Sequence, residues 1–93
     1  MTACQITVTG HVQGVGFRYA CCACAQTLGV AGWVRNAADG SVAIHAEGTT
    51  DAVEALLAWC HEGPPGARVR QVVVNPAAAK DVREFTVRYS MLG

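Results

Sequence analysis

Two stretches of the sequence carry apolar residues at helical spacing, and their order among strand-like stretches constrains the fold more than any other feature. The first begins at Phe17 and stops before Gly29, and its apolar face consists of Phe17, Ala20, Cys21, Cys24 and Leu28. The apolar face of the second consists of Val53, Leu56, Leu57 and Cys60. Asp51, with Glu54 three residues later, is the expected N-cap of the second helix. The Gly-Pro-Pro-Gly run at 63–66 ends that helix, so the sequence predicts two amphipathic helices.

Segments with strand patterns surround these two helices. A short turn at 38–40 with the Asp-Gly signal joins two of them into a predicted hairpin. The expected strands cover residues 4–10, 30–37, 41–47, 68–75 and 85–89. The order is therefore β-α-β-β-α-β with a short fifth strand, and right-handed crossovers place both helices on one face of the sheet. This order predicts an α+β protein with a ferredoxin-like βαββαβ sandwich and a mostly antiparallel sheet.

Length and charge limit the possible functions. The chain has 93 residues, which suit one domain spanning 1–93, and seven Lys and Arg balance seven Asp and Glu. A net charge of zero argues against broad electrostatic binding to nucleic acid or to an acidic membrane surface. The longest uncharged run, residues 19–34, is too short and too polar to span a membrane, and no signal-peptide pattern is present. We therefore expect a monomeric cytoplasmic protein with no nucleic-acid or membrane partner.

The five cysteines offer an alternative function. Cys21 and Cys24 form a C-x-x-C pattern, and small metal-carrying domains of this fold hold soft metals through such a pair near the first helix. Both residues fall on the apolar face of the predicted helix, however, so we interpret them as buried free thiols of a reducing compartment. Cys22 points off that face and is the thiol expected to be accessible. A disulfide between Cys60 and a cysteine of the first helix stays open.

The segment from Gly10 to Arg18 is the candidate site for chemistry. Its glycines permit conformations in which successive amides point inward at a helix N-terminus, where they form a site for an anion. Arg18 in the first turn offers paired donors to phosphate oxygens. The predicted phosphate-binding residues are Gln13, Gly14, Val15, Gly16, Phe17 and Arg18. The segment matches neither a Walker A loop nor G-x-G-x-x-G, and on its residues alone a plain tight turn explains it equally well.

Two motifs make the chain resemble a known family. Residues 10–18, Gly-His-Val-Gln-Gly-Val-Gly-Phe-Arg, are similar to the first signature of the acylphosphatase family. Gly32-Trp33-Val34-Arg35-Asn36, followed by Gly40, Val42 and Gly48, resembles the second signature at the usual separation. The resemblance extends to residues 64–69 and 85–89. It implies a small enzyme without cofactor or metal that hydrolyses acyl phosphates, such as acetyl phosphate, with Arg18 and Asn36 as catalytic residues.

The chemistry fits these assignments. An acyl phosphate already has a good leaving group, so catalysis requires positioning and charge stabilisation more than acid catalysis. Arg18 would neutralise the phosphoryl charge and Asn36 would orient the attacking water, and the phosphate itself would take the proton. Inorganic phosphate or sulfate would then compete with substrate. Without the resemblance, Asn36 would be interpreted as a turn residue that bonds local backbone.

The remaining polar and aromatic residues are weaker candidates. His11 and His45 are expected to face solvent, and His61 is expected at the end of the second helix. Trp33 and Trp59 are interpreted as packing residues. An RNA-binding module of this shape would need aromatic side chains on its central strands, but the outward positions of the first and third strands are Gln5, Thr7, Thr9, Ala43 and His45. A degenerate relative that only binds anions is a further alternative, although Arg18 and Asn36 are both present.

Overall fold

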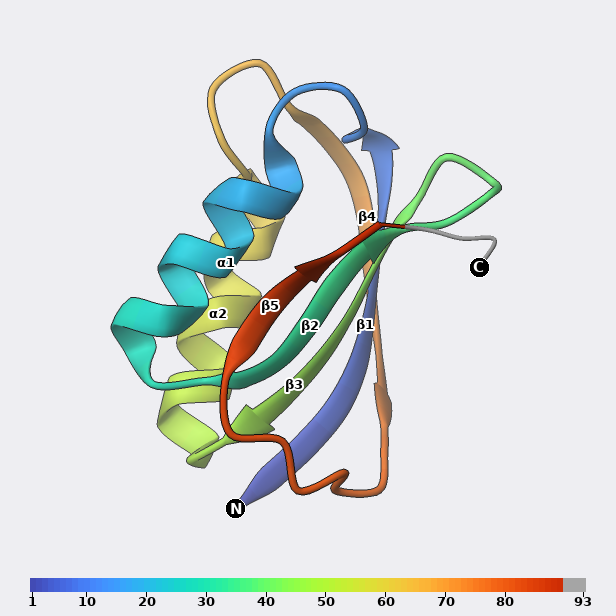
Figure 1. The fold of residues 1–93 in the computed structure, drawn as a ribbon. Helices are drawn as coiled ribbons and strands as arrows, with labels where there is room; N and C mark the ends of the chain where they lie inside the picture. Colours follow the sequence, from blue (N-terminus) through green and yellow to red (C-terminus); the bar gives the residue numbers. More distant parts are fainter. Residues whose placement is uncertain (90–93) are drawn as a thin grey trace.

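Two helices cover one face of a five-stranded sheet in this computed structural model, which describes residues 1–89 (Figure 1). The elements are β1 (Thr2–His11), α1 (Phe17–Leu28), β2 (Ala31–Asn36), β3 (Val42–Gly48), α2 (Thr50–Glu62), β4 (Arg68–Pro76) and β5 (Phe85–Arg88). The strand order is β4-β1-β3-β2-β5, and every neighbouring pair is antiparallel except β2 with β5. The predicted βαββαβ order and short fifth strand are therefore confirmed. The last four residues of the predicted domain lie outside the described residues.

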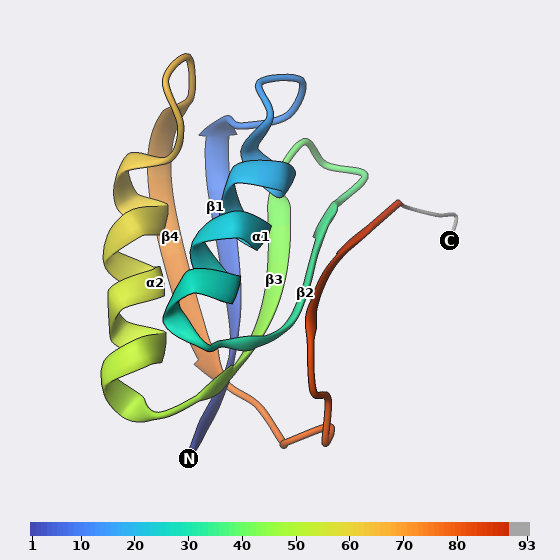
Figure 2. The ribbon, with the colours of Figure 1, turned by 60° about the vertical axis from the view of Figure 1, so that its left-hand side comes forward.

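The core lies between the helices and the sheet, and Figure 2 shows the two helices in front of the strands that they cover. Side chains of a strand alternate between its two faces, and the alternate residues from Cys4 to Val8 in β1 and from Val42 to Ala46 in β3 belong to this core. The fully buried side chains of this layer include Ile6, Val8, Phe17, Cys21, Val34, Val42, Ile44, Leu56 and Cys60. Trp59 packs on Phe17 with their ring centres 5.1 Å apart, in the packing role expected for it. Within residues 1–89, neither helix is long and apolar enough to cross a bilayer.

Both helices depart in detail from the predicted pattern. Thr49, rather than Asp51, is the N-cap of α2, because the extended backbone of Thr49 lets its Oγ1 accept the amide hydrogen of Ala52. Asp51 lies in the first turn, where its charge still favours the helix dipole. In α1, Ala25 is buried while Cys24 is only half-buried. A helix repeats every 3.6 residues, so the buried line follows offsets of 0, 4 and 8 from Phe17.

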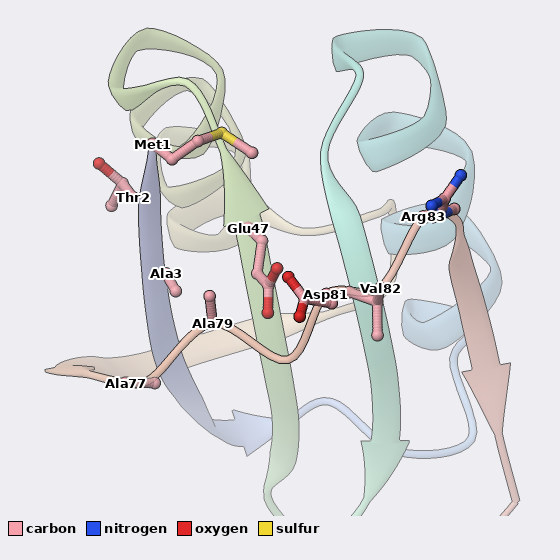
Figure 3. Close-up of a pocket in the computed structure, with 9 residues that line it drawn as sticks. All are labelled: Met1, Thr2, Ala3, Glu47, Ala77, Ala79, Asp81, Val82 and Arg83. Atoms are coloured by element: carbon pink, nitrogen blue, oxygen red, sulfur yellow. The ribbon is translucent and has the colours of Figure 1, made fainter.

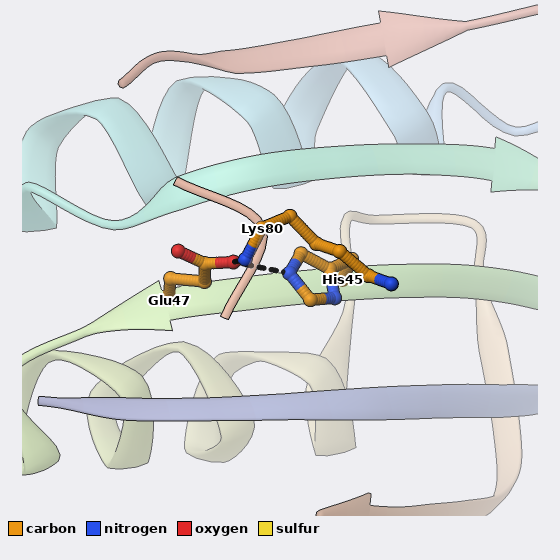
Figure 4. Close-up of polar contacts among 3 residues, drawn as sticks. All are labelled: His45, Glu47 and Lys80. Carbon is orange, nitrogen blue, oxygen red and sulfur yellow. Dashed lines mark hydrogen bonds and ion pairs between the residues drawn. The ribbon is translucent and has the colours of Figure 1, made fainter. Parts of the chain in front are cut away.

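The expectation that His45 faces solvent is wrong. His45 lies on the sheet face away from the helices, yet it is completely buried. Its ring stacks on Trp33 with the ring centres 4.4 Å apart, and its Nε2 lies 2.6 Å from Glu47 Oε2 (Figure 4). The connection from β4 to β5 covers this pair because the strand order forces it to cross the three inner strands (Figure 3). The Lys80 amide in that connection donates to the same Glu47 oxygen.

The buried Glu47 carboxylate makes stability depend on pH. Hydrogen bonds, first from His45 and then from the Lys80 amide, hold the pKa of Glu47 below its ordinary value of 4.5. A carboxyl with a lowered pKa in the folded state stabilises the fold above pH 4.5, and that contribution is lost as the pH falls through the folded-state pKa. We expect the urea midpoints of the wild type and Glu47→Gln to converge as the pH falls below 4.5. Glu54→Gln on the exposed side of α2 is the control, and a gap between wild type and Glu47→Gln that stays constant with pH would contradict the assignment.

Candidate active site

The loop between β1 and α1 brings an unusual backbone to the start of the helix. Gly14 and Gly16 have φ angles of 76° and 79°, in the left-handed region that favours glycine. A Cβ at either position would meet no atom within 4 Å, so the backbone at these two residues borders open space. Val12 is buried in the core and Val15 packs against it, so both residues fix the loop on its core side. The loop is therefore anchored by its valines and open at its glycines.

The N-terminus of α1 is left uncapped, in contrast to that of α2. The cap residue of α1 is Gly16, which has no side chain to accept an amide hydrogen, and no acidic residue lies in its first turn. Among residues 1–89, the loop, turn and side-chain hydrogen bonds use none of the amides of 13–18. These N–H groups and the positive end of the helix dipole suit an anion such as a phosphoryl group.

Arg18 adds a full positive charge to this region. Its Nη1 donates to the backbone carbonyl of Arg88 at 3.2 Å, at the end of β5. The guanidinium carbon lies 5.1 Å from the ring centre of Tyr89 and 5.9 Å from that of Tyr19, and the two tyrosine hydroxyls are hydrogen-bonded to each other. The only ion pair within residues 1–89 joins His45 to Glu47, so no carboxylate neutralises Arg18 in this part of the chain. The guanidinium is held in place and keeps donors for a ligand.

Asn36 ends β2 and carries an unsatisfied oxygen. The residue is half-buried, and its Oδ1 is buried without a hydrogen-bond partner among residues 1–89. A buried polar atom without a partner is costly, and such atoms often mark a functional site. The interpretation of Asn36 as a turn residue would require its side chain to bond the local backbone, which Oδ1 does not. The carboxamide can therefore accept a hydrogen bond from a molecule that enters the site.

Two contacts join the loop and the helix start to the strand end that carries Asn36. Gln13 Nε2 donates to the carbonyls of Ala37 at 2.8 Å and Ser41 at 2.9 Å, on the turn after β2. Because Arg35 of β2 pairs with Arg88 of β5, the carbonyl that holds Arg18 also lies beside the end of β2. Figure 1 shows the loop, this turn and the end of β5 at the same end of the sheet. The fold thus gathers the predicted residues Arg18 and Asn36 with the loop amides.

The sequence did not reveal every residue of this arrangement. The Arg88 carbonyl and the Tyr19–Tyr89 pair support Arg18, but a backbone carbonyl has no sequence signal. The side chain of Gln13, which was predicted to bind phosphate through its amide, is engaged by the neighbouring turn. A hollow of about 600 Å³ lies at the opposite end of the sheet under the β4–β5 connection, and Met1, Glu47 and Asp81 are among the residues that line it (Figure 3).

The C-x-x-C pair that suggested a metal carrier, Cys21 and Cys24, lies within helix α1. All five cysteines are free thiols, and Cys4, Cys21 and Cys60 are buried, while Cys22 and Cys24 are half-buried. A hydrogen bond with Cys60, together with burial, raises the pKa of Cys21, and burial raises the pKa of Cys22 and Cys24. Thiols that hold their protons are poor metal ligands. Within residues 1–89, no three His, Cys, Asp or Glu side chains are arranged to hold a metal ion.

Comparison with known proteins places this arrangement in a family. The sequence pattern of the Acylphosphatase family matches residues 4–87. The chain belongs to the acylphosphatase family. An acylphosphatase of Nocardioides sp. is 53% identical over 94% of this chain and 88% of its own length. The crystal structure of an acylphosphatase from Bacillus subtilis superposes with a TM-score of 0.93 at 36% identity, covering 96% of this chain and 100% of that chain.

A second solved structure agrees with this assignment. An acylphosphatase from Coxiella burnetii superposes with a TM-score of 0.90 at 39% identity, covering 94% of this chain and 92% of that chain. These likenesses confirm the family resemblance, the ferredoxin-like fold and the prediction of an acylphosphatase-type hydrolase. They favour the enzyme over the metal carrier and the RNA-binding module.

Proposed function

We propose that the chain hydrolyses the carboxyl–phosphate anhydride of small acyl phosphates, with the phosphoryl group held by the loop amides and Arg18. The observation that carries the proposal is the uncapped start of α1, where the amides of 13–18 are free beside a guanidinium that no carboxylate within residues 1–89 neutralises. Gly14, Val15, Gly16 and Phe17 contribute backbone N–H groups, as does Gln13. Together they offer convergent donors to a doubly charged group.

The proposed reaction is an in-line displacement by water at phosphorus. Water forms a bond to phosphorus as the bond to the carboxylate oxygen breaks, and the products are a carboxylate and inorganic phosphate. The leaving carboxylate is stable, so it departs without strong acid catalysis. The amides and Arg18 stabilise the charge on the equatorial oxygens, which is the main requirement of phosphoryl transfer.

Asn36 is the residue we propose to orient the attacking water. Its Oδ1 is buried and lacks a partner among residues 1–89, so it is available to accept a hydrogen bond from that water. A carboxamide does not accept a proton at neutral pH. In the proposed step, the proton of the water therefore goes to a phosphoryl oxygen.

A phosphate-release assay tests the proposed function. We expect purified protein to release phosphate from acetyl phosphate and benzoyl phosphate at a rate that EDTA does not change, because Arg18 and the amides supply the positive field that a metal would otherwise provide. Inorganic phosphate and sulfate should inhibit competitively. Activity that vanishes in EDTA and returns with one particular metal would contradict the proposal, as would a rate no higher than that of an Arg18→Ala control.

We further propose that the chain acts as a cytoplasmic monomer. Its five free thiols suit a reducing compartment. The proposed site needs no residue from a second copy, because the loop, Arg18 and Asn36 all come from one chain. Size-exclusion chromatography with light scattering under assay conditions tests the oligomeric state.

A further inference from the structure

The side chain of Gln13 contacts the β2–β3 turn through two hydrogen bonds. Both hydrogen bonds that its Nε2 donates go to backbone carbonyls of the β2–β3 turn, to Ala37 at 2.8 Å and to Ser41 at 2.9 Å. A carboxamide nitrogen carries two N–H donors, and here both are used. The contact is part-buried and joins residues 24 and 28 positions apart in the sequence.

The turn that Gln13 contacts also has hydrogen bonds of its own. The Ala37 amide donates to the Ser41 carbonyl at 2.8 Å, so that carbonyl receives one hydrogen from the turn and one from Gln13. Asp39 Oδ1 accepts from the Ser41 amide at 2.9 Å and from the Ser41 hydroxyl at 2.6 Å. Because the turn is braced internally, a contact at its two ends fixes its position as a whole.

Asn36 is covalently bonded to Ala37, the first residue that Gln13 holds. The Asn36 Oδ1 has no partner among residues 1–89, so its position depends on its packing and its backbone rather than on a hydrogen bond of its own. The backbone is set on one side by the pairing of β2 with β3 and on the other by the turn. Gln13 therefore links the loop, through the Ala37 carbonyl, to the backbone that carries the carboxamide of Asn36.

We propose that Gln13 is a positioning residue that sets the distance between the phosphate-binding loop and Asn36. The inference rests on the proposed function. The phosphoryl group sits on the loop and the water sits on Asn36, so the link fixes how the nucleophile approaches phosphorus. A misplacement of about 1 Å at a reacting pair costs on the order of 100-fold in rate.

The test compares Gln13→Leu with a matched glutamine elsewhere. Leucine keeps the volume and removes both donors, while the backbone amide of residue 13 stays in the loop. We expect kcat for acetyl phosphate to fall about 10- to 100-fold, with the Kd of inorganic phosphate nearly unchanged. Gln26→Leu is the control, because Gln26 Nε2 also donates to a backbone carbonyl, that of Phe85 at 3.2 Å. Neither of these two residues belongs to the β1–α1 loop. The kcat of Gln26→Leu should match the wild type.

A second variant separates positioning from structural support. Gln13→Glu keeps the shape and loses both donors at neutral pH, but a protonated carboxyl regains one O–H donor. We expect the kcat of Gln13→Glu to approach that of the wild type as the pH falls below about 5. The kcat of Gln13→Leu should remain the same fraction of the wild-type kcat at every pH. In an Asn36→Ala background, Gln13→Leu should lower kcat by less than about threefold, because the two residues act as a unit.

The possible outcomes distinguish a positioning role of Gln13 from a purely structural role and from failure of the proposed function. A folded Gln13→Leu protein with wild-type kcat overturns the inference while leaving the proposed function intact. A lowered melting temperature with unchanged kcat in both Gln13 variants assigns Gln13 a structural role only, and this result also overturns it. If the wild type releases no phosphate above the Arg18→Ala control, the proposed function fails and the inference fails with it.

Discussion

Replacing Arg18 with alanine is expected to lower kcat/KM for acetyl phosphate by about 10³- to 10⁵-fold, the range that an arginine contributes to phosphoryl transfer. On the proposed mechanism the guanidinium faces the phosphoryl oxygens before and during the reaction, so both ground state and transition state lose a charge-assisted contact. Arg18→Lys should not restore activity, because lysine keeps the charge but loses the planar pair of donors and the contact with the Arg88 carbonyl. Phosphate release and the Kd of inorganic phosphate, measured by calorimetry, check both variants.

The matched control for this prediction is Arg83→Ala. Arg83 is exposed and borders the hollow at the other end of the sheet, so its removal changes the net charge equally without touching the loop. Its kcat/KM should stay within about twofold of the wild type, since surface charges outside the site act weakly through screened water. A lysine variant with near wild-type kcat would refute the role assigned to Arg18.

Replacing Asn36 with alanine is expected to lower kcat by about 10²- to 10³-fold, the loss typical of one hydrogen-bonding group that acts in the transition state. Phosphate affinity should change far less, because in the proposed mechanism Asn36 contacts the water and not the phosphoryl oxygens. The two variants therefore have different signatures: Arg18→Ala weakens both catalysis and phosphate binding, and Asn36→Ala weakens catalysis alone. Steady-state kinetics combined with calorimetric titration of phosphate distinguishes them.

Stability is the second readout for Asn36. The side-chain oxygen of Asn36 makes no hydrogen bond within residues 1–89, so the alanine variant should unfold at nearly the wild-type urea concentration. Asn75→Ala on the exposed edge strand β4 gives the baseline for losing an asparagine. If Asn36→Ala kept its kcat and lost stability, Asn36 would be a turn residue, and water activation would need another group.

The parts of the fold that the sequence predicted well depend on local patterns. Helix α1 spans the predicted range from Phe17 to Leu28 because one repeating apolar face and a glycine stop define it. The candidate catalytic residues were predicted through the two family motifs. The anion-binding loop was predicted from the positions of the glycines between Gly10 and Arg18. Asn36 lies at the candidate site because it ends strand β2 just before the Asp-Gly turn.

The parts that were missed depend on contacts between distant segments. His45 was expected to be exposed because the pattern of its own strand gives it the face away from the helices, whereas Trp33 and the β4–β5 connection bury it. Thr49 is the N-cap of α2, whereas the sequence predicted Asp51, because the backbone geometry before the helix decides which side chain reaches the free amide. The support of Arg18 by a carbonyl 70 residues away has no local pattern to reveal it.

The long-range support of Arg18 has a consequence for biosynthesis. By the time α1 and β2 have emerged from the ribosome, the loop, Arg18 and Asn36 are all synthesised, yet the carbonyl of Arg88 that holds the guanidinium is still to be made. In a nascent chain the arginine therefore lacks its anchor, and β5 can pair with β2 only after it leaves the exit tunnel. On the proposed mechanism, catalytic competence follows the synthesis of β5, and the appearance of hydrolysis would report that this strand has paired with β2.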